Sequence, residues 1–245
     1  MINSVAHGAA LAALTSAPSN VGIRLEANQI HVWCASLDEF HLDRCRLHDT
    51  LSADERVRAD RFHSDDDRER YMRSRGILRE LLARYLGQPA STIAFTYGQF
   101  GKPFIAGPKG RPSLFFNVSH SGALALYALT QTSAVGVDVE QMREIPEPDA
   151  IALRHLDRVD ADRVLAAPPE RRIEEFFLCW TRKEALMKAT GEGIGRERSP
   201  YPPSSWQLHN LWPAPGYLGA VACKHDAAAI TLRSVSKESM CRLQS

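Results

Sequence analysis

The order of secondary-structure signals along this chain repeats, and that repeat constrains the fold more than any other feature of the sequence. The strand patterns are apolar or alternating runs bounded by Gly, Pro or Ser, and they lie at 28–35, 91–97, 113–118 and 123–130, and then at 133–140, 204–212, 216–223 and 228–235. In each series, helical patterns follow the first strand. The repeat therefore suggests two halves of similar element order, 25–132 and 133–245, each with strands and helices, after a flexible N-terminal extension at 1–24.

The helices of the first half have recognisable ends. Ser52 stands three residues before Glu55, which is the spacing of a capping box and predicts a helix start. A second helix is predicted to end at Gly87 and to carry apolar residues at helical spacing on one side. The other side is rich in arginines, namely Arg70, Arg73, Arg79 and Arg84. This basic side is either a solvated helix face or a surface for an acidic partner.

Composition and charge exclude several functional classes. The 30 Lys and Arg residues and 29 Asp and Glu residues give a net charge of +1, so we expect no general attraction to nucleic acid or to an anionic membrane. The five cysteines are odd in number and lack Cys-x-x-Cys spacing, which argues against a disulfide framework and a zinc site. The sequence shows no signal-peptide pattern and no transmembrane stretch, so we expect a cytoplasmic protein with reduced thiols.

Two carboxylates lie on one face of the strand predicted at 133–140. Val135, Val137 and Val139 alternate there with Gly136, Asp138 and Glu140. In a strand the Cα atoms of Asp138 and Glu140 are roughly 6.5 to 7 Å apart, with both side chains on the same face. Such a pair is either a solvated polar face or a site for a hard cation such as Mg²⁺, which prefers oxygen ligands.

A third carboxylate, Glu184, lies on the largely apolar side of a helix predicted at 174–191. It shares that side with Phe177, Trp180 and Lys188. Because an unpaired buried charge is costly, Glu184 needs a partner. Lys188, four residues further on, could supply an ordinary helical ion pair. Together with Asp138 and Glu140, however, Glu184 also suggests a three-carboxylate metal site.

A Mg²⁺ ion held by few carboxylates usually takes phosphate oxygens from its substrate, so nearby basic residues acquire a possible role. Phosphate contacts are available from Lys102, Lys183, Lys188 and His120. His120 follows Ser119 at the end of the strand-like run "FNVSHSG" (116–122). Adjacent Ser and His residues do not form a hydrolase triad, and a Gly-x-Ser-x-Gly elbow is missing from the sequence.

Four motifs stand in one order along the chain: "GKPF" (101–104), "FNVSHSG" (116–122), "GVDVE" (136–140) and "WTRKEALMK" (180–188). In this order and with these gaps, the sequence resembles the Sfp-type 4′-phosphopantetheinyl transferases, which activate carrier proteins of peptide, polyketide and fatty-acid synthesis. The resemblance runs from about residue 30 to residue 223. It implies two pseudo-symmetric α+β halves that bind coenzyme A in the cleft between them.

The resemblance also implies which residues bind coenzyme A. Ser119 and His120 match positions that hold the nucleotide end, and Lys102 matches a lysine of the same pocket. The stretch that the family places near the adenosine 3′-phosphate contains Arg58, Arg61, Arg70 and Arg75. Glu55 departs from the pattern, because some relatives carry a lysine there.

The resemblance further implies a metal site and a reaction. Asp138, Glu140 and Glu184 match Mg²⁺-binding acids, while Lys183 and Lys188 match basic residues along the pyrophosphate. The implied reaction transfers phosphopantetheine from coenzyme A to a serine of an apo carrier protein, which is an acyl, peptidyl or aryl carrier domain. Glu184 is then a candidate base, and Lys183 a candidate for stabilising the leaving phosphate.

Two other functions fit the same residues. One is a non-catalytic coenzyme A-binding or regulatory protein of the same fold, and the other is a Mg²⁺-dependent phosphohydrolase. The intact acids at 138, 140 and 184 argue against the first. We expect the protein to be a monomer that binds neither nucleic acid nor membrane.

Overall fold

The structure is a computed structural model that describes residues 23–39, 49–98, 101–105, 114–191, 205–224 and 229–235. In chain order its elements are β1 (Gln29–Ser36), α2 (Ala53–Ala59), α3 (Asp65–Leu86), the 3₁₀ turn η1 (Ala90–Thr92), β2 (Thr96–Tyr97), β3 (Pro103–Phe104), β4 (Phe115–Ser121), β5 (Leu124–Thr130), β6 (Gly136–Gln141), α4 (Pro148–His155), α5 (Arg158–Ala166), α6 (Pro169–Thr190), β7 (Trp206–Leu211), β8 (Tyr217–Lys224) and β9 (Ala229–Ser234). The predicted extension at 1–24 lies almost entirely outside the described residues.

The strands form two main sheets and one small hairpin. One sheet has the order β4-β5-β1-β9, the other has the order β6-β8-β7, and β2 pairs with β3. The predicted strand at 228–235 forms as β9, but it joins the first sheet by parallel pairing with β1. The C-terminal segment therefore crosses back to the sheet built by the N-terminal half. The division of the chain at 132/133 stays a prediction.

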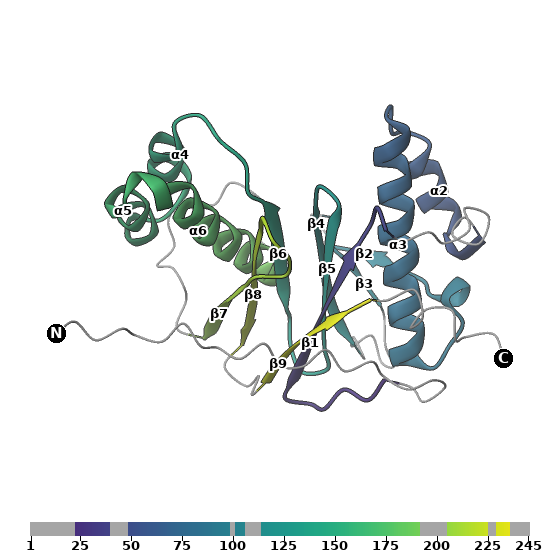
Figure 1. The fold of residues 1–245 in the computed structure, drawn as a ribbon. Helices are drawn as coiled ribbons and strands as arrows, with labels where there is room; N and C mark the ends of the chain where they lie inside the picture. Colours follow the sequence, from purple (N-terminus) through teal and green to yellow (C-terminus); the bar gives the residue numbers. More distant parts are fainter. Residues whose placement is uncertain are drawn as a thin grey trace.

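Four layers follow one another from one side of the molecule to the other (Figure 1). Helix α3 covers the outer face of the first sheet, where Leu78 and Leu82 pack with Trp33 and Tyr127. The inner faces of the two sheets meet through apolar side chains. Val32 and Leu126 come from the first sheet, and Val137, Val139 and Val221 come from the second. Helix α6 covers the outer face of the second sheet. This layered arrangement of helices and sheets confirms the α+β prediction.

The predicted capping box at the start of α2 is confirmed, and it has a second role. The backbone N–H of Ser52 donates to Glu55 Oε2 at 3.0 Å. The carboxylate of Glu55, which is 1% exposed, also accepts hydrogen bonds from Arg75 Nε at 2.7 Å and from Arg79 Nε at 2.6 Å. Since the buried guanidinium group of Arg79 and the partly buried one of Arg75 compensate one buried carboxylate, this cluster ties α2 to α3.

The predicted strand at 91–97 was wrong over its first residues. Residues 90–92 form a 3₁₀ turn, and only Thr96 and Tyr97 are in a strand. Arg79 Nη1 donates to the carbonyl oxygens of Ala90 at 3.1 Å and Ile93 at 2.8 Å. These carbonyls are satisfied by a side chain of α3, which no strand pattern could have indicated.

No helix among the residues described by the structure has both the length and the apolar character needed to cross a membrane.

A buried polar network joins β1, α3 and β9. Tyr85 Oη lies 2.6 Å from His31 Nδ1 and accepts a hydrogen bond from Trp33 Nε1 at 2.8 Å. Arg233 Nη2 lies 3.1 Å from His31 Nε2. An arginine is always a donor, so Nε2 accepts and the proton of neutral His31 is on Nδ1. Burial and, to a lesser extent, the charge of Arg233 lower the pKa of His31 from 6.5 to about 4.

We expect this network to make the protein less stable in acid. Between about pH 6.5 and pH 4 the unfolded chain binds a proton at His31 that the folded protein does not bind, so the free energy of unfolding falls as the pH falls. The full loss from this residue is about 3 kcal/mol. Urea unfolding from pH 7.5 to pH 4 should show a shallower pH dependence in His31→Gln than in wild type. The exposed His63→Gln serves as the control, and an unchanged pH dependence in His31→Gln would contradict this account.

Candidate functional site

The two sheets meet along their edge strands β4 and β6, and side chains of β4 complete the hydrogen bonds of the β6 edge. Asn117 Oδ1 accepts from the backbone N–H of Val137 at 2.9 Å. Ser121 Oγ accepts from the backbone N–H of Gln141 at 3.1 Å. We call this contact the β4–β6 seam, defined by Asn117, Ser119, Ser121, Asp138 and Glu140. Asn117, Ser119 and Ser121 are alternate residues of one strand, so all three point to the same side.

Both carboxylates of β6 accept hydrogen bonds from serines of the β4–β6 seam. Ser119 Oγ donates to Asp138 Oδ1 at 2.8 Å, and Ser121 Oγ donates to Glu140 Oε2 at 2.9 Å. Asp138 is 3% exposed, while Glu140 is only partly buried. The valines that alternate with them, Val137 and Val139, belong to the core between the two sheets. The predicted alternation of this strand is therefore confirmed.

Helix α6 lies directly against the start of β6 because residue 136 is a glycine. A Cβ atom at Gly136 would lie 1.9 Å from the carbonyl oxygen of Ala185 and 2.5 Å from the backbone nitrogen of Ala189. Any side chain at this position would push the helix away from the strand. The close approach brings the last turns of α6, including Lys188, to the β4–β6 seam.

Lys188 binds the β4–β6 seam directly. Its Nζ donates to Asp138 Oδ1 at 2.6 Å and to Ser119 Oγ at 2.9 Å. The sequence alternative of an ion pair between Glu184 and Lys188 is therefore wrong for the residues that the structure describes, because Lys188 pairs with Asp138 of the neighbouring strand. The ammonium group, the hydroxyl and the carboxylate form one compact polar cluster between the two sheets.

The pKa values of all three predicted metal-binding acids are raised, mainly by burial. Desolvation is the largest cause of the raised pKa of Glu184, and the charges of Asp138 and Glu140 add to it. Desolvation also raises the pKa of Glu140, with a further contribution from Asp138. For Asp138 itself, desolvation raises the pKa more than Lys188 and Ser119 lower it. The three carboxylates are thus close enough to repel, which favours a positive charge among them.

Asp138 has one oxygen that suits such a charge. Its Oδ2 atom is buried and has no hydrogen-bond partner in the described structure. Among the described residues, however, no group of three or more His, Cys, Asp or Glu side chains stands at metal-binding spacing. The donor chemistry therefore fits a hard cation such as Mg²⁺, but the side chains would have to converge to coordinate it.

The other two predicted phosphate-binding lysines make backbone contacts. Lys183 Nζ donates to the carbonyl oxygen of His155 at 2.5 Å, at the end of α4, and lies 5.5 Å from the ring centre of Trp180. Lys102 Nζ donates to the carbonyl oxygens of Lys188 at 2.5 Å and Val135 at 3.2 Å. Neither lysine contacts the seam carboxylates, so their predicted contacts with phosphate stay predictions.

The predicted arginines fall into two groups. Arg70 binds Asp38 through two hydrogen bonds, at 2.9 and 3.0 Å, and Arg75 binds Glu55, so both are engaged with acids. Arg58 lies 5.7 Å from the ring centre of Tyr71 and belongs to an open pocket of about 750 Å³. The pocket is lined by Ala53, Asp54, Val57, Arg58, Arg61 and Phe62. An anion entering this pocket would therefore meet Arg58 and Arg61 rather than Arg70 or Arg75.

His120 occupies the end of β4, where the strand-like run was predicted to finish. Its side chain is exposed, yet desolvation and then the charge of Lys188 lower its pKa, against a smaller opposite effect of Asp67. His120 therefore lies in the combined field of the β4–β6 seam and of the N-terminal end of α3. A neutral imidazole is favoured there until an anion approaches.

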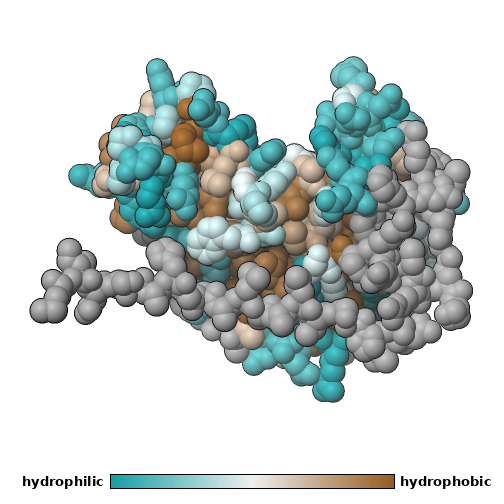
Figure 2. Space-filling model, viewed as in Figure 1, coloured by the Kyte–Doolittle hydropathy of each residue, from teal (hydrophilic) through white to brown (hydrophobic). Residues whose placement is uncertain are grey.

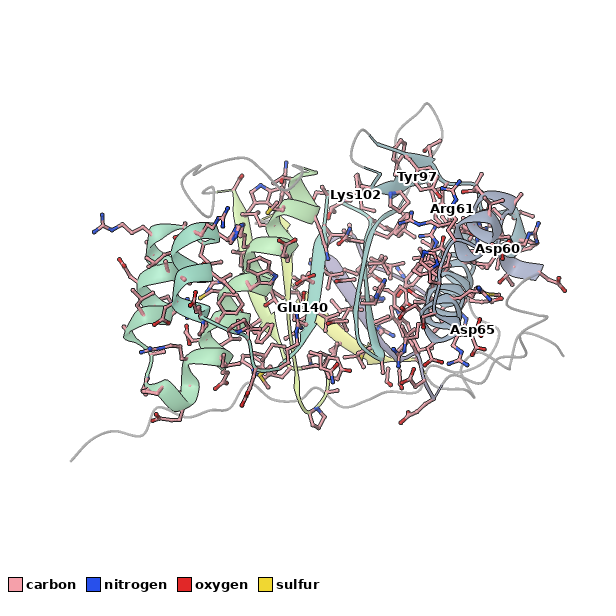
Figure 3. All side chains as sticks on the ribbon, turned by 90° about the horizontal axis from the view of Figure 1, so that it is seen from above. Asp60, Arg61, Asp65, Tyr97, Lys102 and Glu140 are labelled. Carbon is pink, nitrogen blue, oxygen red and sulfur yellow. The ribbon has the colours of Figure 1, made fainter. Side chains whose placement is uncertain are left out.

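The surface above the β4–β6 seam is hollowed. Figure 2 shows a hollow between a lobe of mixed hydropathy formed by α4 and α5 and a hydrophilic lobe formed by α2 and α3. The turn between β4 and β5 and the C-terminal end of β6 reach this region in Figure 1. Seen from above, Glu140 lies near the middle, between α6 and the first sheet (Figure 3).

Sequence reasoning missed several residues that build this site, above all Asn117, Ser121 and Gly136. A signal for the first two was present, because Asn117, Ser119 and Ser121 occupy alternate positions and therefore share one face of the strand. The contact partners of Gly136, Lys102 and Lys183 lie on other elements and left no trace in the local pattern. These contacts became apparent only in three dimensions.

Comparison with known proteins decides the family. A sequence profile for the N-terminal part of 4′-phosphopantetheinyl transferase matches residues 32–132, and the profile of the 4′-phosphopantetheinyl transferase superfamily matches residues 134–234. The chain is 34% identical over 217 residues to the 4′-phosphopantetheinyl transferase HetI of Nostoc sp., which covers 84% of this chain and 92% of HetI. The chain belongs to the 4′-phosphopantetheinyl transferase superfamily. The resemblance noted in the four motifs is thereby confirmed.

Other members of the superfamily match a shorter stretch. The 4′-phosphopantetheinyl transferase Sfp of Bacillus subtilis (strain 168) is 27% identical over 59% of this chain and 62% of its own length. The 4′-phosphopantetheinyl transferase psf-1 of Bacillus pumilus is 33% identical over 59% of each protein. The chain thus matches less than two thirds of the length of these two relatives.

The ion pair at the β4–β6 seam gives a stability prediction. In Lys188→Met the buried carboxylate of Asp138 loses its countercharge, and we expect the free energy of unfolding to fall by about 2 kcal/mol at pH 7. Because the pKa of Asp138 is already raised by burial and rises further without Lys188, the folded variant takes up a proton as the pH falls. The loss relative to wild type should therefore shrink in acid.

A double-mutant cycle separates this effect from lost packing. In an Asp138→Asn background, Lys188→Met should cost much less than in wild type, as measured by chemical denaturation at pH 7. Equal costs in both backgrounds would show that the pair contributes nothing to folding.

Proposed function

We propose that this chain transfers the 4′-phosphopantetheine group of coenzyme A to a serine hydroxyl of an apo carrier protein and releases adenosine 3′,5′-bisphosphate. The observation that carries the proposal is the gathering of Asp138, Glu140, Glu184 and Lys188 at the β4–β6 seam of a chain from this superfamily. The hollow above the seam is the proposed site for coenzyme A. The carrier is an acyl, peptidyl or aryl carrier domain that docks at the mouth of this hollow.

The chain's own residues suit a phosphoryl transfer, which depends mainly on positioning and charge neutralisation. Lys188 presents an ammonium group between the two sheets, where it can meet pyrophosphate oxygens. Glu184 is the proposed acceptor of the serine proton, since a raised pKa brings a carboxylate closer to the working pH of a base. Lys183 would reach the leaving phosphate only after it releases the carbonyl of His155.

Asp138, Glu140 and Glu184 are the proposed ligands of Mg²⁺. The unpartnered Oδ2 atom of Asp138 and the mutual repulsion of the three acids support this assignment. A bound Mg²⁺ ion supplies positive charge that neutralises phosphate oxygens. Glu184 cannot bind Mg²⁺ and accept the serine proton through the same oxygen atom at the same time. Its roles as metal ligand and as base are therefore alternatives.

The nucleotide end of coenzyme A is proposed to contact Ser119, His120 and the Arg58 pocket. Arg70 and Arg75 are less suited to hold its 3′-phosphate, because Asp38 and Glu55 already bind them. The arginine-rich side of α3 is likewise neutralised by acids at several positions. Arg58 and Arg61 line the pocket proposed for the 3′-phosphate, so they are not counted among the partners of an acidic carrier. As part of the same proposal, the protein is a cytoplasmic monomer that modifies biosynthetic carrier proteins. It binds neither nucleic acid nor membrane.

Intact-mass measurement tests the proposed function. The protein is incubated with coenzyme A, Mg²⁺ and an apo carrier protein, and both the carrier and the small molecules are then analysed. A carrier that gains the mass of phosphopantetheine supports transfer. Coenzyme A hydrolysis without carrier modification would favour a phosphohydrolase, and bound but unaltered coenzyme A would favour a binding protein.

The carboxylates give a catalytic prediction. Asp138→Ala, Glu140→Ala and Glu184→Ala should each lower kcat/KM for transfer by 100-fold or more, which corresponds to about 2.7 kcal/mol. The physical reason is that each variant removes one of the negative groups proposed to hold the cation.

Glu170→Ala removes an exposed acid from the first turn of α6, the helix that carries Glu184. This variant is the matched control and should remain active. Circular dichroism should show that all four variants are folded. A seam variant with wild-type kcat/KM at limiting Mg²⁺ would remove that residue from the proposed site.

A further inference from the structure

Lys102 immediately precedes β3, in the small β2–β3 hairpin, yet its ammonium group binds backbone at the start of β6 and at the end of α6. The backbone of Lys102 is held in place by the hairpin, because its carbonyl oxygen accepts from the N–H of Gly98 at 3.0 Å. Its side chain extends toward β6 in Figure 3. There Nζ donates to the carbonyl oxygens of Val135, at 3.2 Å, and Lys188, at 2.5 Å.

The two carbonyl groups lie next to the elements that carry the three carboxylates. Val135 immediately precedes β6, the strand that carries Asp138 and Glu140. Lys188 lies in the last turn of α6, the helix that carries Glu184. The carbonyl groups of a last helical turn have no partner inside the helix, and a cation there also interacts favourably with the helix dipole. The ammonium group of Lys102 therefore donates hydrogen bonds both to a carbonyl oxygen at the end of α6 and to one just before β6.

The two elements joined by Lys102 already lie in very close contact. Gly136 allows the backbone of α6 to approach β6, and Ala185 and Ala189 are fully or almost fully buried at this contact. The side chain of Lys188 leaves the same turn and reaches Asp138 and Ser119. A shift of this helical turn relative to β6 would thus move Lys188 and Glu184 away from the seam carboxylates.

We infer that Lys102 is a positioning residue that fastens the last turn of α6 to the start of β6 from the opposite half of the molecule, and not a ligand of a coenzyme A phosphate. The inference rests on the proposed function for its kinetic consequences, but not for the contact itself. Burial of the ammonium lowers the pKa of Lys102 to about 8, as expected for a group withdrawn from solvent.

The two roles of Lys102 predict different kinetics. A phosphate ligand contributes mainly to substrate affinity, so its loss raises KM for coenzyme A and matters less for 3′-dephospho-coenzyme A or other truncated donors. A positioning residue acts on the arrangement of Lys188 and Glu184, so its loss lowers kcat with every donor. We expect Lys102→Met to lower kcat by 10-fold or more with both donors and to change KM for coenzyme A by less than threefold.

Lys102→Arg should recover most of the lost kcat, because a guanidinium group can donate to two carbonyl oxygens. The exposed Lys224→Met, which removes a lysine from the end of β8, is the matched control and should behave as wild type. Lys102→Gln, which keeps a donor group, takes the place of the Met variant if that variant does not fold.

Amide hydrogen exchange tests the contact independently of activity. In wild type the N–H of Gly191 donates to the carbonyl of Met187 at 3.0 Å, so amides at the end of α6 report on this turn. Their exchange should be at least 10-fold faster in Lys102→Met than in wild type, and near wild type in Lys102→Arg. If no variant transfers phosphopantetheine, the proposed function fails while the exchange result still decides the role of Lys102.

Two results would overturn the inference. One is wild-type exchange at the end of α6 in Lys102→Met. The other is a rise of 10-fold or more in KM for coenzyme A with kcat unchanged, which would make Lys102 a phosphate ligand.

Discussion

The structure depends on the way in which β4 completes the edge of β6 with side chains. Asn117 and Ser121 accept hydrogen bonds from backbone N–H groups of β6, and Ser119 and Ser121 donate to its carboxylates. An edge strand satisfied in this way can belong to one sheet and still lie beside another. The two sheets can then pack face to face and keep their polar residues gathered at one edge.

This arrangement also explains the electrostatics of the site. The β4–β6 seam and the close approach of α6 at Gly136 withdraw three carboxylates from water and place them within each other's fields. Lys188 pairs with Asp138, and Arg143 lies 3.8 Å from Glu140, yet burial still raises the pKa of all three carboxylates. The negative charge that remains favours a cation at the seam. The proposed pyrophosphate, which is itself an anion, becomes a suitable partner only when that cation is present, and this requirement connects the fold to the proposed chemistry.

The sequence predicted those parts of the site that depend on local patterns. Alternation placed Asp138 and Glu140 on one strand face, and helical spacing placed Glu184 and Lys188 on one helix side. What the sequence could not predict depends on contacts between distant segments. Lys188 pairs with Asp138 rather than Glu184, Arg75 is bound by Glu55, and β9 returns to β1. The motif resemblance supplied the family, but it did not show that Lys102 binds two backbone carbonyls.

A crystal structure of the protein with coenzyme A and Mn²⁺ in place of Mg²⁺ tests the central claim most directly, because Mn²⁺ can be located by its anomalous scattering. The account predicts one strong anomalous peak at the β4–β6 seam, within coordination distance of Asp138 Oδ2 and of a coenzyme A phosphate oxygen. Glu140 and Glu184 should turn toward the same peak. An ordered coenzyme A molecule with no peak at the seam, or with its pyrophosphate away from Asp138, would contradict the account.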